Sequence, residues 1–267
     1  MQPEERQHRI AEYLQRVEFA SLEELARAVD VSQSTIRRDL TILENGGGIR
    51  RTHGGARVLD PRTDEFVFNA RDTHQLAEKE AIGRACADLI QPGQSVIIDA
   101  GTTAFHAARY LESKRPMVIT NSLPVANLYG SNNAVEVVVS GGVVYPRLGV
   151  LVGPLAIESF SRMHADVAIM GAGGITTDGV TNSHLLLIEL QRTMMRVAQR
   201  IIFCLDHTKF GRRSMAPLCG LEAFQTVVTD QGAPQELVAA LRNRSIEVVL
   251  APSQPGGASE DAPPTPV

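Results

Sequence analysis

The chain has 267 residues and a formal net charge of −4, with 43% hydrophobic and 21% charged residues. This length suits two domains, and the composition is that of a soluble globular protein. Because no apolar run reaches about eighteen residues and the first residues are charged, we expect neither a membrane span nor a secretion signal. Three cysteines, Cys86, Cys204 and Cys219, lack metal-ligand spacing. They predict free thiols in a cytoplasmic protein without a metal or cofactor.

Three short amphipathic helices are predicted near the start of the chain. Their apolar positions are Ile10, Leu14 and Val17, then Leu22, Leu25, Ala26 and Val29, and then Ile36, Leu40 and Leu43. Ser21 and Glu24 form a capping-box pattern at the second helix, and Ser32 is the N-cap candidate of the third. The connection between these two helices is short and contains Asp30, a residue type that tolerates a left-handed turn. With Val31 at the elbow, this spacing predicts a helix-turn-helix.

A glycine-flanked segment, residues 46–58, follows the third helix. Its short run of Ile, Arg and Thr predicts a two-stranded hairpin, or wing, rather than a plain interdomain loop. The stretch 32–58 is locally basic, since Arg37, Arg38, Arg50, Arg51 and Arg57 stand against only Asp39 and Glu44. A basic surface confined to one stretch is what a small DNA-reading element requires.

This order of elements predicts that the third helix enters the major groove of double-stranded operator DNA. Arginine pairs with guanine and glutamine with adenine, whereas serine and threonine are less selective, and wing cations contact phosphates or the minor groove. A solvated polar face is the alternative for any single side chain, but it leaves the combination of helix, turn, helix and cationic wing unexplained. The predicted DNA-binding residues are Gln33, Ser34, Thr35, Arg37 and Arg38 on the helix and Arg50, Arg51 and His53 on the wing.

From about residue 77, predicted strands and helices alternate. Strands rich in Val and Ile with helices between them indicate a mostly parallel sheet covered on both faces. Strands are expected at 95–99, 117–120, 135–140, 167–171, 201–205, 226–229 and 248–250, and helices at 78–90, 104–111 and 185–199. The predicted fold class is therefore α/β, with a winged helix-turn-helix at 3–58, a linker at 59–76, an effector-sensing and oligomerisation domain at 77–250 and a disordered tail at 251–267.

Four turns of small residues follow predicted strands and are candidates for a ligand site. The first, a Gly-Thr-Thr turn at the start of a helix, offers N–H and hydroxyl groups to an anion such as phosphate. Ligands of open α/β sheets lie outside the carboxyl ends of the strands, so we expect the four turns to converge, although each alone also fits an ordinary turn. The candidates are Asp99, Gly101, Thr102, Thr103, Asn121, Ser122, Gly141 and Gly142, with the turn at 171–174.

Two later loops add charged candidates, Asp178 in the first and Asp206 with Lys209 in the second. A phosphorylated, hydroxyl-rich ligand would suit this set, because lysine and N–H groups bind phosphate and carboxylates accept from hydroxyls. Asp206 and Lys209 equally suit an ion pair that fixes their own loop.

Residues 22–56 resemble the N-terminal signature of the DeoR family of transcription regulators. The matching strings lie at 35–40, 43–44 and 50–56, and the resemblance extends to about residue 230. It implies a sensor domain similar to ribose-phosphate isomerase, glucosamine-phosphate isomerase and CoA-transferase folds. It also implies a sugar phosphate or related phosphorylated metabolite as effector, with contacts near Lys209 and the residues of the first three turns.

Three positions depart from the family pattern: Asp30 stands where Gly is frequent, Gly173 where an Asp is common, and Gln191 where a Lys is frequent. We expect a homo-oligomeric repressor of a carbohydrate-metabolism operon, because paired heads on successive half-sites require a fixed spacing. The alternative is a sugar-phosphate isomerase-like enzyme with an accessory DNA-binding head. Its general base would have to be Asp99, Asp178, Glu189 or Asp206. A DNA-binding scaffold without a ligand would leave the four turns unexplained.

Overall fold

The computed structural model describes residues 3–17, 19–45, 49–52, 54–58 and 68–252. The chain divides into two compact units, residues 1–67 and 68–267, which are called the head unit and the sensor unit below. Part of the predicted linker therefore belongs to the sensor unit, where helix α5 (Phe68–Thr73) forms. The predicted tail from residue 253 onward and the linker residues 59–67 lie outside the described residues.

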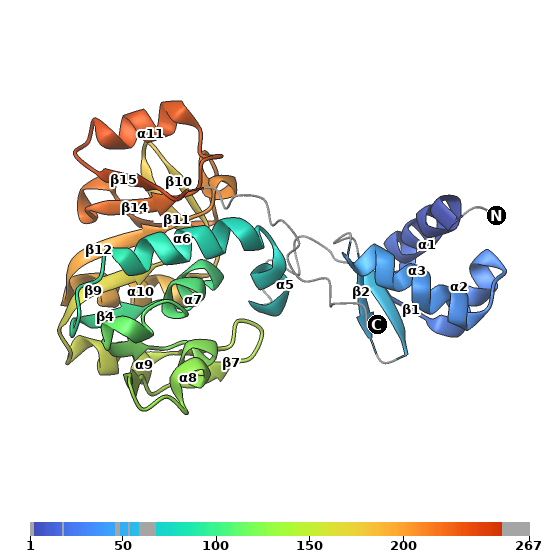
Figure 1. Cartoon of the computed structure of the whole chain (residues 1–267), viewed down its shortest axis with the longest axis horizontal. Helices are drawn as coiled ribbons and strands as arrows, with labels where there is room; N and C mark the ends of the chain where they lie inside the picture. Colours follow the sequence, from blue (N-terminus) through green and yellow to red (C-terminus); the bar gives the residue numbers. More distant parts are fainter. Residues whose placement is uncertain (1–2, 18, 46–48, 53, 59–67, 253–267) are drawn as a thin grey trace, which may run out of the picture. The chain divides into compact units, whose positions relative to one another are not determined.

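The head unit consists of three helices and a small antiparallel sheet (Figure 1). Its elements are α1 (Pro3–Val17), β1 (Phe19–Ser21), α2 (Leu22–Val29), α3 (Gln33–Asn45), β2 (Ile49–Thr52) and β3 (Gly55–Val58). The predicted wing is confirmed as the β2–β3 hairpin, and its register pairs Arg51 with Ala56. Strand β1, which the sequence analysis did not predict, pairs with β3 on the other side. Gly55 allows this approach, because a Cβ there would lie 2.1 Å from the carbonyl oxygen of Ala20.

Local sequence signals determine the ends of the predicted helices. The Ser21–Glu24 capping box is present, and Asp30 ends α2 in the left-handed region at φ 53°. The Thr35 N–H donates to Ser32 Oγ at 3.3 Å, as an N-cap requires. Val17, predicted on the apolar face of the first helix, is instead 45% exposed, because it is the last residue of α1. The buried core of the unit comprises Ile10, Leu14, Ala20, Leu25, Val29, Ile36, Leu40, Ile49 and Ala56.

The sensor unit is built on a seven-stranded parallel sheet in the order β15-β14-β12-β9-β4-β5-β6. Its strands are β4 (Ser95–Ile98), β5 (Met117–Thr120), β6 (Glu136–Val139), β9 (Ala165–Met170), β12 (Ala198–Cys204), β14 (Thr226–Thr229) and β15 (Glu247–Leu250). All seven predicted strands are therefore present and belong to this one sheet. The larger helices are α6 (Leu76–Asp88), α7 (Thr102–Ala108), α8 (Leu123–Tyr129), α9 (Pro154–Ser161), α10 (Leu185–Val197) and α11 (Gln235–Arg242).

Both faces of the sheet are buried. Ile98 and Ile169 pack into one hydrophobic cluster with residues of α6, α7 and α8. Ile97 and Ala168, one residue earlier on the same strands, pack into a second cluster with residues of α9, α10 and α11. This alternation follows from the two-residue period of a strand and explains why the strands consist of almost continuous Val and Ile. Figure 1 shows α6 and α7 over one face of the sheet.

Two small antiparallel sheets, separate from the large one, were not predicted. One is the hairpin of β7 (Val143–Tyr145) and β8 (Val150–Val152). The other is an antiparallel sheet of β10 (Gly174–Thr176), β11 (Gly179–Asn182) and β13 (Ala216–Cys219). Short 3-10 helices occur at η1 (Glu112–Lys114), η2 (His207–Lys209) and η3 (Leu221–Ala223).

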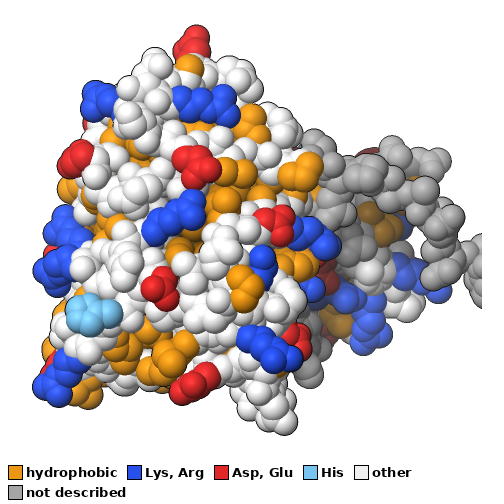
Figure 2. Space-filling view, turned by 60° about the vertical axis from the view of Figure 1, so that its left-hand side comes forward, with side chains coloured by type: hydrophobic (Ala, Val, Ile, Leu, Met, Phe, Trp, Pro, Cys, Tyr) orange, Lys and Arg blue, Asp and Glu red, His pale blue; other side chains and the backbone are white. Residues whose placement is uncertain are grey.

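Charged side chains of both signs are interspersed with hydrophobic ones on the face of the sensor unit that Figure 2 presents. No helix within the described ranges is long and apolar enough to cross a membrane.

Candidate DNA-binding and effector-binding sites

Helix α3 presents most of its predicted DNA-contacting side chains to solvent. Gln33, Ser34, Arg37 and Arg38 are exposed, and Thr35 is half-buried. The first turn of α3 contains no acidic residue that would repel a phosphate group. The Ser34 and Thr35 hydroxyls lie 2.8 and 3.0 Å from Ser32 Oγ. The Ser34 and Thr35 hydroxyls therefore have a partly structural role at the start of the helix. Of the predicted DNA-binding residues on α3, Gln33, Arg37 and Arg38 are the exposed ones that make no such contact.

An ion pair that the sequence analysis missed anchors α3 to α1. Arg6 Nε donates to Asp39 Oδ2 at 2.6 Å, Arg6 Nη2 donates to Oδ1 at 3.1 Å, and Gln7 Nε2 donates to the same Oδ1 at 3.2 Å. Asp39 is 2% exposed, and these donors satisfy both of its carboxylate oxygens within the head unit. Asp39 lies next to Arg38 in the chain, and the pair therefore fixes the orientation of the exposed face of α3.

The wing is joined to the end of α3 through Arg51. Its backbone N–H and Nε donate to the Glu44 carboxylate at 2.9 and 2.7 Å, and Nη1 donates to Thr41 Oγ1 at 2.8 Å. The predicted phosphate contact of Arg51 therefore competes with an internal ion pair. Arg50 lies in β2, and its side chain, like all of His53, is outside the described residues.

The predicted ligand turns lie around the point where the strand order of the sheet reverses. From β4 the chain proceeds to β5 and β6 on one side, whereas β9, β12, β14 and β15 follow on the other. The turns after β4 and β9 meet closely, since a Cβ on Gly101 would lie 3.4 Å from Gly171 Cα. Such a reversal point is where open α/β sheets bind ligands. We call this edge, formed by the turns after β4, β5, β6 and β9, the crevice, after the ligand position that such a reversal point has in open α/β sheets.

Asp99 is the central polar group of the crevice. It is 3% exposed, and its Oδ2 accepts from the Gly171 N–H at 3.0 Å and from Gln191 Nε2 at 2.7 Å. Gln191 Oε1 in turn accepts from Asn182 Nδ2 at 2.7 Å. Burial raises the pKa of Asp99, and the hydrogen bonds from Gln191 and Gly171 oppose that rise. Gln191, which in the sequence is only a departure from the family pattern, therefore hydrogen-bonds to Asp99 at the crevice.

The absence of a carboxylate at position 173 has a steric explanation. A Cβ on Gly173 would lie 2.4 Å from Ser214 Oγ and 3.1 Å from Ser183 Oγ. Two hydroxyl groups therefore occupy the space in which an aspartate side chain would begin.

The remaining candidates occupy different environments. Thr102, Thr103, Asn121, Ser122 and Asp206 are buried at the carboxyl ends of β4, β5 and β12, and Lys209 is half-buried in η2. The Gly141 N–H donates to Ser159 Oγ at 3.2 Å. Gly142 has φ +133°, a backbone conformation that favours glycine.

Asp178 lies apart from these candidates. It is exposed in the β10–β11 turn, at the end of the hairpin far from Gly173, and its carboxylate pairs with Arg213.

A buried lysine next to the loop after β12 was also missed. Lys79 of α6 is 4% exposed, and its ammonium donates to the carbonyl oxygens of Arg71 and His74 at the end of α5. Burial lowers its pKa to about 8, and attraction to Asp206 opposes this. Lys79 therefore fixes the turn from α5 to α6 next to the loop after β12.

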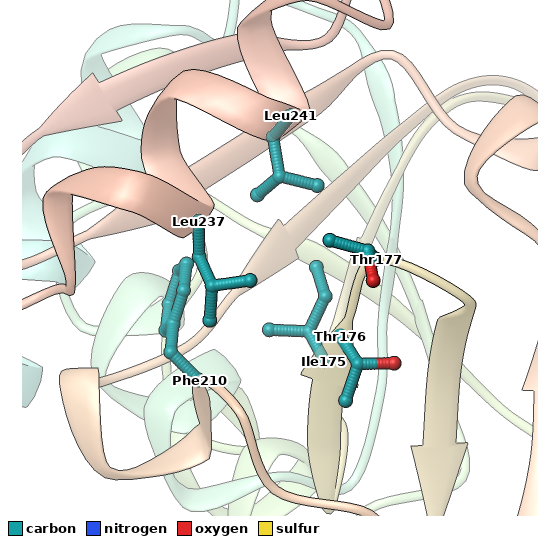
Figure 3. Close-up of a pocket in the computed structure, with 6 residues that line it drawn as sticks. All are labelled: Ile175, Thr176, Thr177, Phe210, Leu237 and Leu241. Carbon is teal, nitrogen blue, oxygen red and sulfur yellow. The ribbon is translucent and has the colours of Figure 1, made fainter.

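A hydrophobic hollow lies between α11 and β10 (Figure 3). Leu237 and Leu241, one turn apart on α11, face the end of β10 there. The lining includes none of the predicted effector residues and no charged side chain, so we interpret the hollow as packing between helix and hairpin. The lining residues are Ile175, Thr176, Thr177, Phe210, Leu237 and Leu241.

A winged helix-turn-helix head and an α/β unit with buried polar turns at its reversal point are the features of DNA-binding regulators that carry a sensor domain. Comparison with known families agrees: residues 6–62 match the DeoR-like helix-turn-helix domain, and residues 74–231 match the DeoR C terminal sensor domain. The chain belongs to the DeoR family of transcription regulators, as its sequence motifs predict.

Several curated relatives match the chain over nearly its whole length. The HTH-type transcriptional regulator GolR of Listeria innocua is 34% identical and covers 94% of this chain and 100% of its own. The glycerol-3-phosphate regulon repressor of Escherichia coli is 30% identical with the same coverage of 94% and 100%. The L-fucose operon activator of Haemophilus influenzae is 30% identical and covers 86% and 93%. Among solved structures, a ribose 5-phosphate isomerase A of Methanocaldococcus jannaschii matches 49% of this chain and 53% of its own at 13% identity and a TM-score of 0.36.

Proposed function

We propose that this protein represses a carbohydrate-metabolism operon and that a sugar phosphate, or a related phosphorylated metabolite, modulates its DNA binding. The observation that carries the proposal is the sheet reversal in a DeoR sensor domain, where Asp99 and the turns after four neighbouring strands, β9, β4, β5 and β6, lie together. Relatives named for a glycerol-3-phosphate regulon and a fucose operon support this class of regulated genes.

The proposed DNA contacts are those of α3, with Gln33, Arg37 and Arg38 at base edges and Ser34 and Thr35 nearer the helix start. Arg50, Arg51 and His53 of the wing are proposed to contact phosphates or the minor groove. Effector binding can alter operator affinity only if the effector binds one arrangement of the assembly better than another. We therefore propose a homo-oligomer whose paired heads match two half-sites only in the effector-free arrangement.

The isomerase alternative is not favoured. Relatives are named as regulators, and Asp99, the acid placed centrally in the crevice, already accepts from Gln191 and Gly171. A general base must be able to reach a substrate proton.

A gel-shift experiment tests the proposal with DNA upstream of the protein's own gene at fixed salt concentration. The panel consists of glycerol 3-phosphate, ribose 5-phosphate, glucose 6-phosphate and fructose 1-phosphate, each with its unphosphorylated parent, and inorganic phosphate. We expect one phosphorylated compound to change the fraction of DNA bound and its parent to have no effect. Binding that is indifferent to the whole panel would refute the effector class and leave the DNA-binding assignment intact.

A further inference from the structure

Two buried side-chain oxygens at the crevice have no hydrogen-bond partner among the described residues: Asn121 Oδ1 and Ser140 Oγ. Asn121 is 0% and Ser140 3% exposed. The two residues directly follow Thr120 and Val139, which are paired in the parallel register of β5 and β6. Both orphan oxygens therefore lie at adjacent positions of one sheet edge, next to the turn that carries Asp99.

The surroundings of Asn121 determine which kind of ligand group its side-chain oxygen can bind. Asn121 Nδ2 donates to the Leu151 carbonyl at 3.0 Å, and this bond orients the amide so that Oδ1 remains a buried acceptor. A buried acceptor without a donor is costly, whereas a donor that reaches it recovers that cost. A phosphate oxygen is itself an acceptor and would be repelled by Oδ1. A hydroxyl group can donate to Asn121 Oδ1, and the Ser140 hydroxyl can then either donate to or accept from the same ligand.

Strand β8 closes this edge of the crevice. The Leu151 N–H donates to the Asn121 carbonyl at 2.9 Å, and a Cβ on Gly142 would lie 2.7 Å from the Val152 carbonyl oxygen. Side chains of the β7–β8 hairpin pack on Ala100, next to Asp99. The β7–β8 hairpin therefore lies against Asn121 and beside the turn that carries Asp99.

We infer that Asn121 and Ser140 form a hydroxyl-binding subsite of the crevice, which accepts a hydrogen-bond-donating hydroxyl of the effector and excludes its phosphate. The inference rests on the proposed function and deepens it. It gives a role to Ser140, which was not among the predicted site residues. It also predicts the orientation of the bound effector, whose hydroxyl-bearing end lies toward β5 and β6 and whose phosphate lies elsewhere in the crevice.

Thr229 provides a matched control. Its Oγ1 is also buried without a described partner, but Thr229 ends β14, which is separated from β5 by β12, β9 and β4. Ser140→Ala and Thr229→Val each remove one orphan hydroxyl with little change of volume. Both full-length variants should unfold at the wild-type temperature or higher without ligand, because neither loses a hydrogen bond to the described residues.

Binding of the same panel is then measured by calorimetry for the wild type and both variants. We expect Ser140→Ala to bind the active sugar phosphate about tenfold more weakly, with no change for inorganic phosphate, and Thr229→Val to bind both as the wild type does. Removing the hydroxyl that binds this subsite should cost the wild type about tenfold and cost Ser140→Ala less, because Ser140→Ala retains only the Asn121 Oδ1 acceptor. Equal affinity of Ser140→Ala and wild type, or an equal loss for inorganic phosphate, would overturn the subsite while the proposed function stands. A wild type that binds no phosphorylated sugar would overturn both.

Discussion

Adding a side chain at position 173 should destabilise the sensor unit chiefly through a clash with Ser214. Gly173→Ala adds a Cβ 2.4 Å from Ser214 Oγ and 3.0 Å from Ser214 Cβ. The φ of Gly173 is not in the left-handed region, so the cost is steric. Overpacking of this kind lowers the free energy of unfolding by about 1–3 kcal/mol. For a domain of this size, each kcal/mol lowers the Tm by about 2–4 °C. Ser214→Gly removes the two nearest opposing atoms and leaves Ser183 Oγ at 3.1 Å. The Ser214 hydroxyl has no partner among the described residues.

A double-mutant cycle measured by urea unfolding isolates this contact. We expect Gly173→Ala to be destabilised and the double variant to recover most of the loss, with a coupling of about 1–2 kcal/mol. Gly54→Ala is the control, because a Cβ on Gly54 would have no neighbour within 4 Å. Its free energy of unfolding should change little. The steric explanation for the missing carboxylate is refuted if Gly173→Ala is as stable as the wild type, or if Ser214→Gly does not rescue it.

Three further predictions concern the head unit and the crevice. Arg37→Ala should weaken specific operator binding by about 1–3 kcal/mol if Arg37 reads a guanine; an equal loss on scrambled DNA in the same gel-shift assay would assign it to phosphate. Ser21→Ala removes the N-cap of α2 and should lower the free energy of urea unfolding by about 0.5–2 kcal/mol, so an unchanged midpoint would contradict the cap's importance. Because burial raises the pKa of Asp99, the folded state binds that proton more tightly, and the residue's contribution to stability falls as pH rises above the ordinary carboxyl pKa. The stability of Asp99→Asn relative to wild type should therefore increase from about pH 4 upward, and parallel unfolding curves at all pH values would contradict this.

The large sheet was predictable because its strands are buried on both faces. A run such as 226–229 contains only Val and Thr, so it is recognisable without any partner, and β14 has the predicted bounds. The head unit was predictable for a different reason: Ser21, Glu24 and Asp30 act through bonds within a few residues of the chain.

Features that depend on distant residues were not predictable. The Gln191–Asp99 hydrogen bond joins residues 92 positions apart, and nothing near Gln191 in the sequence indicates its partner. The Ser214 hydroxyl that occupies the space beside Gly173 lies on a loop before β13. Strands of three or four residues such as β10 and β11 contain too few apolar positions to show a two-residue period. Asp178 was grouped with the site because of its residue type, whereas the hairpin places its carboxylate on Arg213.

The central claim is that a phosphorylated sugar bound to the sensor unit controls operator binding by the head unit. Fluorescence anisotropy of labelled operator DNA, titrated with the full-length protein at one salt concentration, tests it most directly. We expect the operator Kd to change by about fivefold or more in the presence of one sugar phosphate and to remain constant with its unphosphorylated parent. An operator Kd that is the same with and without a sugar phosphate shown by calorimetry to be bound would contradict the claim.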